Sequence, residues 1–130
     1  MNRVTKLLTA SAAAAALALA TAPPASAYTP KNGILEAGEM GFWSFAGSLG
    51  SVFDIRSAEN NFAGNTYRRG PSAGQSVNNS TLSYTNRDTL TWYVYTSSFR
   101  GGVRGSIPSG HRGDASADFR NNISSAYHNL

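Results

Sequence analysis

Residues 89–107 read TLTWYVYTSSFRGGVRGSI, and this stretch decides the fold class. Its first part, residues 89–95, alternates between two sets of side chains, as a β-strand does because successive residues point to opposite faces. The opposite faces differ in chemistry, and we expect the face made of threonine and tyrosine to meet water. The set that we expect to enter the core is Leu90, Trp92 and Val94.

Turn residues divide the chain into further short strands. Gly101-Gly102 predicts a turn, so residues 103–107 form the return strand of a hairpin. Upstream, residues 41–45 and 51–55 predict a second hairpin around a glycine-bearing turn. Residues 57–74 contain several glycines and asparagines and predict a long loop. Helix-forming residues are scarce after the first 40 positions, so the sequence predicts an all-β fold without helices.

The first 27 residues have the features of a cleaved secretory signal peptide. Arg3 and Lys6 give a positive start, an apolar run follows, and Ala25-Ser26-Ala27 provides a small-residue cleavage site. A membrane anchor is the alternative, but the apolar run is shorter than the roughly 20 residues that span a bilayer. We therefore expect a secreted, extracellular protein that begins near Tyr28 and has no membrane partner after cleavage.

The rest of the chain has the length of one small domain. We expect residues 28–40 to be an N-terminal lead-in and residues 41–130 to be the domain. Without Arg3 and Lys6, the chain has nine basic and seven acidic residues, and the basic residues form no continuous stripe in the sequence. Nucleic acid is therefore not an expected partner. The chain has no cysteine, so packing or a bound ion must do what disulfides do in other small exported domains.

A loose internal repeat divides the domain into halves at about residues 41–86 and 89–127. Each half has an aromatic strand, a glycine-bearing hairpin, a second strand and an Asn-Asn segment that leads to a tyrosine. A half is long enough for a four-strand Greek key, and two such keys pack as a small sandwich. Residues 61–64 are an alternative first-half counterpart of the hairpin at residues 98–101. Recurrence of Asn, Ser and Gly by composition alone is the other explanation.

These features resemble microbial βγ-crystallin domains, in which an aromatic strand and an aromatic-x-Gly hairpin precede an Asn/Asp-Asn/Asp-x-x-Ser/Thr-Ser motif. Most of all, the chain resembles the secreted βγ-crystallin-like peptidase inhibitor family of filamentous soil bacteria, which includes metalloproteinase inhibitors. The resemblance implies a small Greek-key sandwich of βγ-crystallin type with two weakly repeated motifs. Many relatives carry cysteines, which this chain lacks. The stretches that carry the resemblance are residues 77–86, 106–110 and 119–126, within about 41–127.

The same resemblance implies two calcium loops that share their ligands, and hydroxyl, amide and carbonyl oxygens suit Ca²⁺. Both loops depart from the motif, because Leu82 replaces a hydroxyl residue and Arg120 replaces Asn or Asp. We therefore expect Ca²⁺ binding to be weak or lost and no cofactor to be required. The alternative is that the asparagines only satisfy turn backbones. The candidate ligands are Asn78, Asn79, Ser80, Ser83, Asn121, Asn122, Ser124 and Ser125.

Nothing in the sequence predicts catalysis. The chain has two histidines, no cysteine, and neither a Gly-x-Ser-x-Gly nor a His-Glu-x-x-His motif. Glu36 and Glu39 form a pair of carboxylates, but their place in a glycine-flanked lead-in predicts that water solvates both. We expect a protein that is not an enzyme and acts by binding.

The resemblance implies a peptidase inhibitor, so an extracellular protease is the expected partner of a monomeric protein. Such inhibitors present a preorganised surface to a protease cleft. The long loop 57–74 is the candidate surface, with Phe62 and Tyr67 as the residues expected to contact the partner. A solvated connection is the alternative role of this loop. The second expected function is an extracellular calcium-binding or structural βγ-crystallin module with weak or lost calcium sites.

Overall fold

The structure is a computed structural model that describes residues 29–130. The predicted signal peptide, residues 1–27, lies outside the described residues. From residue 29 to residue 130 the chain contains no helix, as predicted, and so none that is long and apolar enough to span a membrane. The strands are β2 (Met40–Phe45), β3 (Leu49–Ile55), β4 (Ser83–Asn86), β5 (Trp92–Ser97), β6 (Gly101–Ile107), β7 (Arg112–Asp114) and β8 (Ser125–Tyr127).

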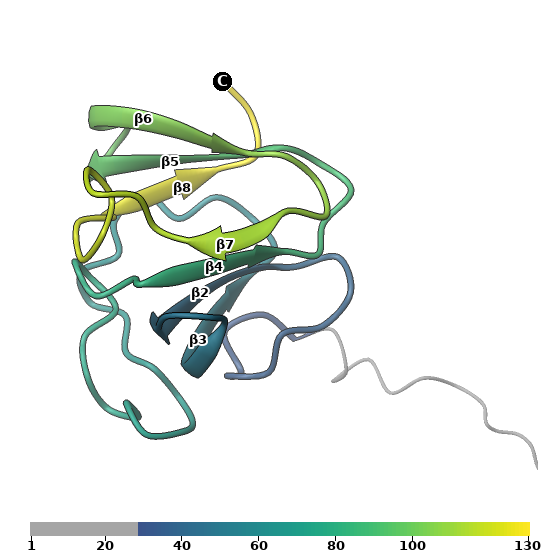
Figure 1. Cartoon of the computed structure of the whole chain (residues 1–130), viewed down its shortest axis with the longest axis vertical. Helices are drawn as coiled ribbons and strands as arrows, with labels where there is room; N and C mark the ends of the chain where they lie inside the picture. The colour runs from purple at the N-terminus through teal and green to yellow at the C-terminus, as the bar shows by residue number, and fades with distance from the viewer. Residues whose placement is uncertain (1–28) are drawn as a thin grey trace, which may run out of the picture.

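The strands form two antiparallel sheets that pack one above the other (Figure 1). One sheet has the strand order β3-β2-β4-β7, and the other has the order β6-β5-β8. Both predicted hairpins are confirmed, because β2 pairs with β3 and β5 pairs with β6. The described chain is therefore the all-β sandwich that the alternating patterns predict.

Each half of the chain completes the sheet of the other half. Strand β7 comes from the second half but pairs with β4 of the first half (Figure 1). In return, Glu59 of the first half forms an isolated bridge with Ala126 in β8. This reciprocal exchange is the arrangement expected of two Greek keys, and a chance recurrence of composition would not produce it.

The two hairpins have the same backbone geometry. Their pairing register shifts after Trp43 in the first hairpin and after Tyr95 in the second. A left-handed glycine follows each turn: Gly50 has a φ of 83° and Gly102 has a φ of 75°. The first-half counterpart of the second hairpin is therefore the turn between β2 and β3, and the alternative at residues 61–64 is wrong.

The two halves differ in the length of chain between hairpin and asparagine loop. Gly50 and Gly102 are 52 positions apart, whereas the left-handed asparagines Asn79 and Asn121 are 42 positions apart. The first half thus contains ten additional residues, and the strand-free segment after β3 accommodates them. The predicted long loop at residues 57–74 lies in this segment.

The core lies between the two sheets. Trp92 and Val94 point into it, as predicted, with exposed fractions of 0% and 3%. The sequence predicts Leu90 there too, but this residue precedes β5 and is 46% exposed, so that prediction is wrong. Tyr95, predicted to meet water, is buried and contacts the ring of Tyr127 edge-on. The other residues of the core are Met40, Phe42, Phe53, Ile55, Phe62, Tyr67, Val77, Ile107, Ile123 and Ala126.

The long loop is anchored in the core by its aromatic residues. Phe62 packs edge-on against Phe42 and Phe53, with ring centroids 5.2 Å apart in both pairs. Tyr67 is also buried, and its hydroxyl lies 2.9 Å from the Ser80 hydroxyl. With exposed fractions of 0% and 2%, Phe62 and Tyr67 cannot touch a partner. The prediction that these two residues contact a protease is therefore wrong. Their side chains fill the core instead, and this burial offsets the entropy lost when the loop becomes ordered.

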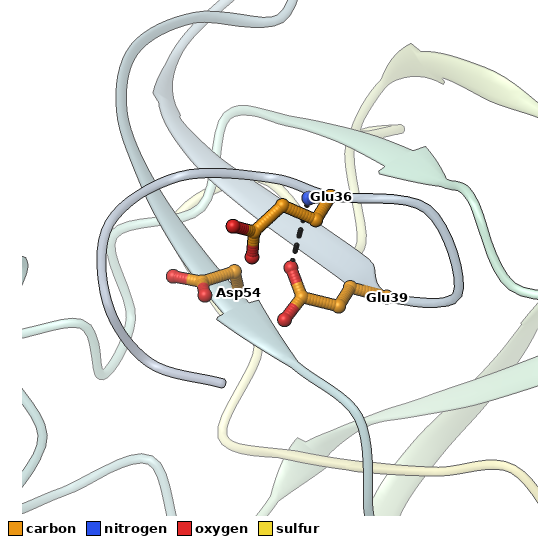
Figure 2. Close-up of side chains that lie close together, drawn as sticks. All are labelled: Glu36, Glu39 and Asp54. Atoms are coloured by element: carbon orange, nitrogen blue, oxygen red, sulfur yellow. Dashed lines mark hydrogen bonds between the residues drawn. The ribbon is translucent and has the colours of Figure 1, made fainter. Parts of the chain in front are cut away.

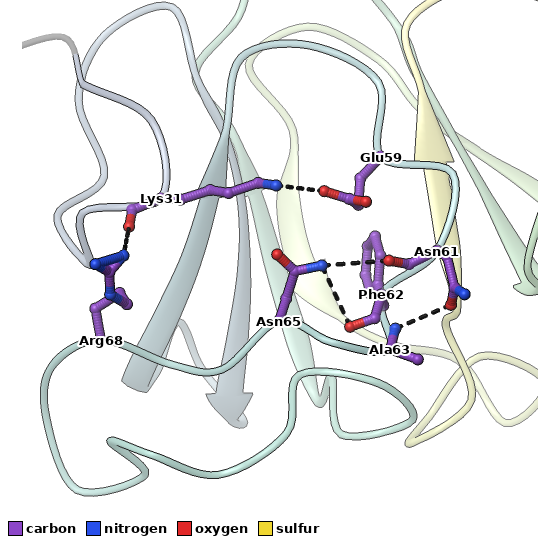
Figure 3. Close-up of polar contacts among 7 residues, drawn as sticks. All are labelled: Lys31, Glu59, Asn61, Phe62, Ala63, Asn65 and Arg68. Carbon is purple, nitrogen blue, oxygen red and sulfur yellow. Dashed lines mark hydrogen bonds and ion pairs between the residues drawn. The ribbon is translucent and has the colours of Figure 1, made fainter.

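Polar contacts hold the same loop to the N-terminal segment (Figure 3). The Lys31 ammonium pairs with the Glu59 carboxylate, and the Arg68 guanidinium donates to the Lys31 carbonyl at 3.2 Å. Within the loop, the Asn65 amide donates to the carbonyls of Asn61 and Phe62. Residues 29–39 are thus attached to the sandwich by hydrogen bonds.

Candidate functional site

The two asparagine-rich loops lie against each other and make equivalent contacts. The Asn79 N–H donates to the Ile123 carbonyl at 3.2 Å, and the Asn121 N–H donates to the Thr81 carbonyl at 2.9 Å. Both asparagines are left-handed, with φ values of 58° and 56°. Asparagine tolerates this conformation better than most residues, which explains its place in both loops.

The last serine of each motif fastens a hairpin. The Ser83 hydroxyl donates to the Phe45 carbonyl at 2.6 Å, and the Ser125 hydroxyl donates to the Ser97 carbonyl at 2.7 Å. Each hydroxyl also accepts a backbone N–H from the turn that it fastens. These two candidate ligands therefore have equivalent structural roles, one in each half.

Two further candidates stabilise local turns. The Ser80 hydroxyl donates to the Val77 carbonyl at 2.7 Å. The Asn122 side-chain amide donates to the Asp118 carbonyl at 3.0 Å. Side-chain bonds of this kind to nearby backbone are what the alternative explanation of the polar loops predicts for these positions.

The remaining first-loop candidates adjoin a serine of the second loop. Ser124 is 7% exposed, and its hydroxyl donates to the Asn79 Oδ1 atom at 3.1 Å. The neighbouring Asn78 Oδ1 atom is buried and has no hydrogen-bond partner within the described chain. A buried polar atom without a partner costs roughly 1–3 kcal/mol, so native proteins rarely leave one without an ion or water.

The equivalent position on the other side of the loop pair lacks these groups. By the 42-residue offset of the left-handed asparagines, Arg120 corresponds to Asn78 and Leu82 corresponds to Ser124. Leu82 has no hydroxyl, and Arg120 has no oxygen in its side chain. The two departures from the motif therefore fall on the same side, and the other side keeps its amide and hydroxyl oxygens.

No family model and no curated protein matches the chain. Several solved structures are similar to the chain. One of them, from a study of the evolution of the eye lens βγ-crystallin domain fold, has a TM-score of 0.60 at 12% sequence identity. The alignment covers 72% of this chain and 88% of that chain. The chain has the βγ-crystallin fold. A βγ-crystallin from Ciona intestinalis has a TM-score of 0.56 at 10% identity, over 71% of this chain and 100% of that one. An archaeal βγ-crystallin has a TM-score of 0.53 at 20% identity, over 72% and 100%.

Outside the asparagine loops of this βγ-crystallin fold, three carboxylates converge near the N-terminal segment (Figure 2). Glu36, Glu39 and Asp54 each place one oxygen within 4.8 Å of the other two, and we call them the acidic cluster. Glu39 and Asp54 are 0% exposed, so the prediction that water solvates Glu39 is wrong. Sequence reasoning missed Asp54, although a lone acid in the apolar run of residues 52–55 was a usable signal.

Backbone N–H groups fix two of these carboxylates. Asp54 accepts from Gly33 at 2.7 Å and from Asn32 at 3.1 Å, and Glu39 Oε1 accepts from Glu36 at 2.9 Å. Burial raises the pKa of Glu39 to about 7, and the charges of Asp54 and Glu36 act in the same direction. Burial also raises the pKa of Asp54.

The tip of the β5–β6 hairpin is exposed but held in place. Phe99 is 67% exposed and left-handed, with a φ of 53°, and Arg100 has a φ of 62°. The Phe99 N–H donates to the Asn60 carbonyl at 2.8 Å. The Arg100 guanidinium lies 3.7 Å from the centre of the Tyr127 ring and donates to the Asn129 carbonyl. The tip thus presents an aromatic side chain on a fixed backbone.

Proposed function

We propose that this chain is a secreted, monomeric, non-enzymatic βγ-crystallin-type binding module that holds one Ca²⁺ ion weakly between its two asparagine loops. The observation that carries the proposal is the buried Asn78 Oδ1 atom, which has no partner in the described residues. This oxygen is a free acceptor, and the next residue in the chain, Asn79, accepts a hydrogen bond from the Ser124 hydroxyl of the other loop.

The chemistry of these groups suits a weak calcium site. Ca²⁺ takes about 6–8 oxygen ligands in a flexible geometry. The side chains of Asn78, Asn79 and Ser124, together with loop carbonyls, would hold the ion. None of the three side chains carries a charge, so the attraction is small, and we expect a Kd of about 10⁻⁴–10⁻³ M, as in other extracellular modules.

The proposal is for one ion rather than two. The resemblance implies two sites that share ligands from both loops, and each loop carries one departure from the motif. By the 42-residue offset of the left-handed asparagines, Leu82 and Arg120 correspond to Ser124 and Asn78, which supports assigning both departures to one of the two sites. Leucine removes an oxygen, and arginine brings a positive charge toward the place of a cation.

The test is to measure the number and affinity of bound Ca²⁺ ions in the purified protein by equilibrium dialysis. We expect Ser124→Ala to remove one weak site, because the variant lacks the buried hydroxyl beside Asn79. The double variant Leu82→Ser with Arg120→Asp should gain a site and a larger calcium-dependent rise in melting temperature. The matched control is Ser106→Ala, which removes an exposed hydroxyl from β6. Unchanged calcium binding in a folded Ser124→Ala protein contradicts the proposal.

The second candidate function is peptidase inhibition, and the β5–β6 tip favours it. Phe99 is 67% exposed, which is the highest exposed fraction among the phenylalanine, tyrosine and tryptophan residues of the described chain. A backbone hydrogen bond to Asn60 fixes its position before binding. A preorganised segment loses little conformational entropy when it enters a cleft. The tip therefore replaces Phe62 and Tyr67 as the surface that would contact an extracellular protease.

An inhibition panel of secreted metallo- and serine proteases, run with and without calcium, tests this candidate. We expect any inhibition to weaken at least tenfold in Phe99→Ala. Leu49→Ala is the matched control, because Leu49 is 63% exposed on the other hairpin. Equal loss in both variants, or inhibition that survives Phe99→Ala, would exclude the tip as the inhibitory surface.

A further inference from the structure

We propose that the acidic cluster of Glu36, Glu39 and Asp54 is a second calcium site, separate from the asparagine loops. The three residues come from different places in the chain: the N-terminal segment, the residue before β2, and strand β3. Figure 2 shows their carboxylates turned toward one another. The Asn-Asn motifs contribute no residue to this group, and the β2–β3 hairpin contributes Asp54.

The spacing of the carboxylate oxygens fits one Ca²⁺ ion. One oxygen from each residue lies within 4.8 Å of the other two. Ca²⁺–oxygen distances are about 2.3–2.6 Å, so oxygens on opposite sides of one ion lie about 4.6–5.2 Å apart. The corresponding separation around Mg²⁺ is only about 4.0–4.2 Å, and Mg²⁺ also gives up its water ligands reluctantly. Separations within 4.8 Å admit either ion, and the reluctance of Mg²⁺ to lose its water ligands is what favours calcium at a site made of carboxylates.

Two oxygens in the cluster are buried and unpartnered. Glu39 is 0% exposed, yet its Oε2 atom has no hydrogen-bond partner in the part of the chain that the structure describes. The same is true of Glu36 Oε1. The Glu39 Oε1 atom already accepts the Glu36 N–H (Figure 2), so this hydrogen bond fixes the side chain and leaves its second oxygen buried without a donor. A buried carboxylate in this state needs a cation or a proton.

The nearby cations leave the cluster with an excess of negative charge. Arg56 lowers the pKa of Glu39, but the opposing effect of burial is larger. Lys31 bonds through its N–H to the Asp54 carbonyl, yet its ammonium pairs with Glu59 instead (Figure 3). Three carboxylates against one arginine leave two negative charges, which one divalent ion balances.

Two other arginines touch the same segment, and both donate to backbone. Arg87 donates to the Leu35 carbonyl at 3.2 Å, and Arg69 donates to the Asn32 carbonyl at 2.9 Å. These contacts shape the turn around the cluster without pairing with its carboxylates. An ion bound here would join the N-terminal segment to β2 and β3, so calcium would order the start of the domain.

Equilibrium dialysis of the purified protein at pH 8, after removal of metal with EDTA, tests the proposal. We expect two bound Ca²⁺ ions in the unmodified protein, one in Glu39→Gln, one in Ser124→Ala and none in the double variant. Calcium affinity at the cluster should exceed Mg²⁺ affinity at least tenfold. Glu59→Gln is the matched control, because it removes a carboxylate that lies outside the cluster and pairs with Lys31.

Folding must be separated from binding. Glu39→Gln should melt in EDTA no lower than the unmodified protein, since a neutral amide avoids the cost of a buried charge. Glu36→Gln is the second variant, because Glu36 is only partly buried and the substitution disturbs packing less. If both variants fold and bind as many ions as the unmodified protein, the acidic cluster is not a calcium site. If Ser124→Ala binds as many ions as the unmodified protein while Glu39→Gln and Glu36→Gln each bind one fewer, the asparagine-loop site is excluded and the calcium site at the acidic cluster is supported.

Discussion

At the scale of single residues, Glu39 predicts how stability depends on pH. Burial raises its pKa from 4.5 to about 7 in the folded chain. The folded state therefore holds this proton more strongly than the unfolded state, so the free energy of unfolding falls as pH rises from about 4.5 to about 7. The fall is at most about 1.4 kcal/mol per pH unit. Urea unfolding in EDTA, at a series of pH values between 4.5 and 8, measures it.

The control for this prediction is Glu39→Gln, which cannot titrate at this position. Its free energy of unfolding should change less over the same pH range, leaving the slope that Asp54 contributes through its own raised pKa. Stability that rises with pH between 5 and 7 in metal-free protein would contradict the prediction, and so would equal slopes in the two proteins.

A second residue-scale prediction uses Trp92 and Leu90 as a pair. Trp92 is fully buried, and its indole N–H donates to Asp88 at 2.9 Å. Trp92→Ala should therefore cost about 3–5 kcal/mol, the usual cost of removing a large core side chain. Leu90 is 46% exposed, so Leu90→Ala should cost about 1 kcal/mol or less. Denaturant unfolding measures both, and equal costs would overturn the observed strand register.

At the scale of elements, a glycine in the β5–β6 hairpin and a glycine between β6 and β7 separate the cost of a steric clash from the cost of a left-handed backbone. Gly102 and Gly110 are both left-handed, with φ values of 75° and 80°. A Cβ at Gly102 would lie 2.1 Å from the Thr96 hydroxyl, whereas a Cβ at Gly110 meets nothing within 4 Å. Alanine at either position carries the left-handed cost of about 1–2 kcal/mol, but only Gly102→Ala adds a clash. Gly102→Ala should thus show the larger loss in melting temperature, and equal losses would exclude the clash.

The elements also show which parts of the fold the sequence predicts. The hairpins could be predicted because alternation and turn glycines are local signals. Strand β7 could not, since Arg112–Asp114 has only three residues and becomes a strand by pairing with distant β4. The burial of Phe62 is equally non-local, because two rings from another part of the chain surround it.

The candidate sites divide in the same way. The Asn-Asn motifs could be found because their residues are consecutive, but which departures share a site depends on how the two loops pair. The acidic cluster was beyond prediction as a unit, because Asp54 reaches Glu36 and Glu39 only when β3 pairs with β2. Short segments fix local structure, and sites assembled from several segments require the tertiary fold.

At the scale of the whole molecule, the exchange of segments makes each half depend on the other. Strand β7 extends the first sheet through its pairing with β4, and Glu59 bridges to β8 at the edge of the second sheet. Side chains from both sheets also form one core. Neither half can keep its sheet complete when the other half unfolds.

This interdependence predicts a single cooperative unfolding transition, and the two tryptophans can test it. Trp43 lies in β2 of the first half, and Trp92 lies in β5 of the second. Two single-tryptophan variants, Trp43→Phe and Trp92→Phe, leave one fluorescent reporter in each half. In each variant the fluorescence and circular dichroism midpoints should coincide, as two-state unfolding requires, although the two variants differ in stability. A fluorescence transition that precedes the loss of β-structure in either variant would show that one half unfolds alone, which the interlocked sheets exclude.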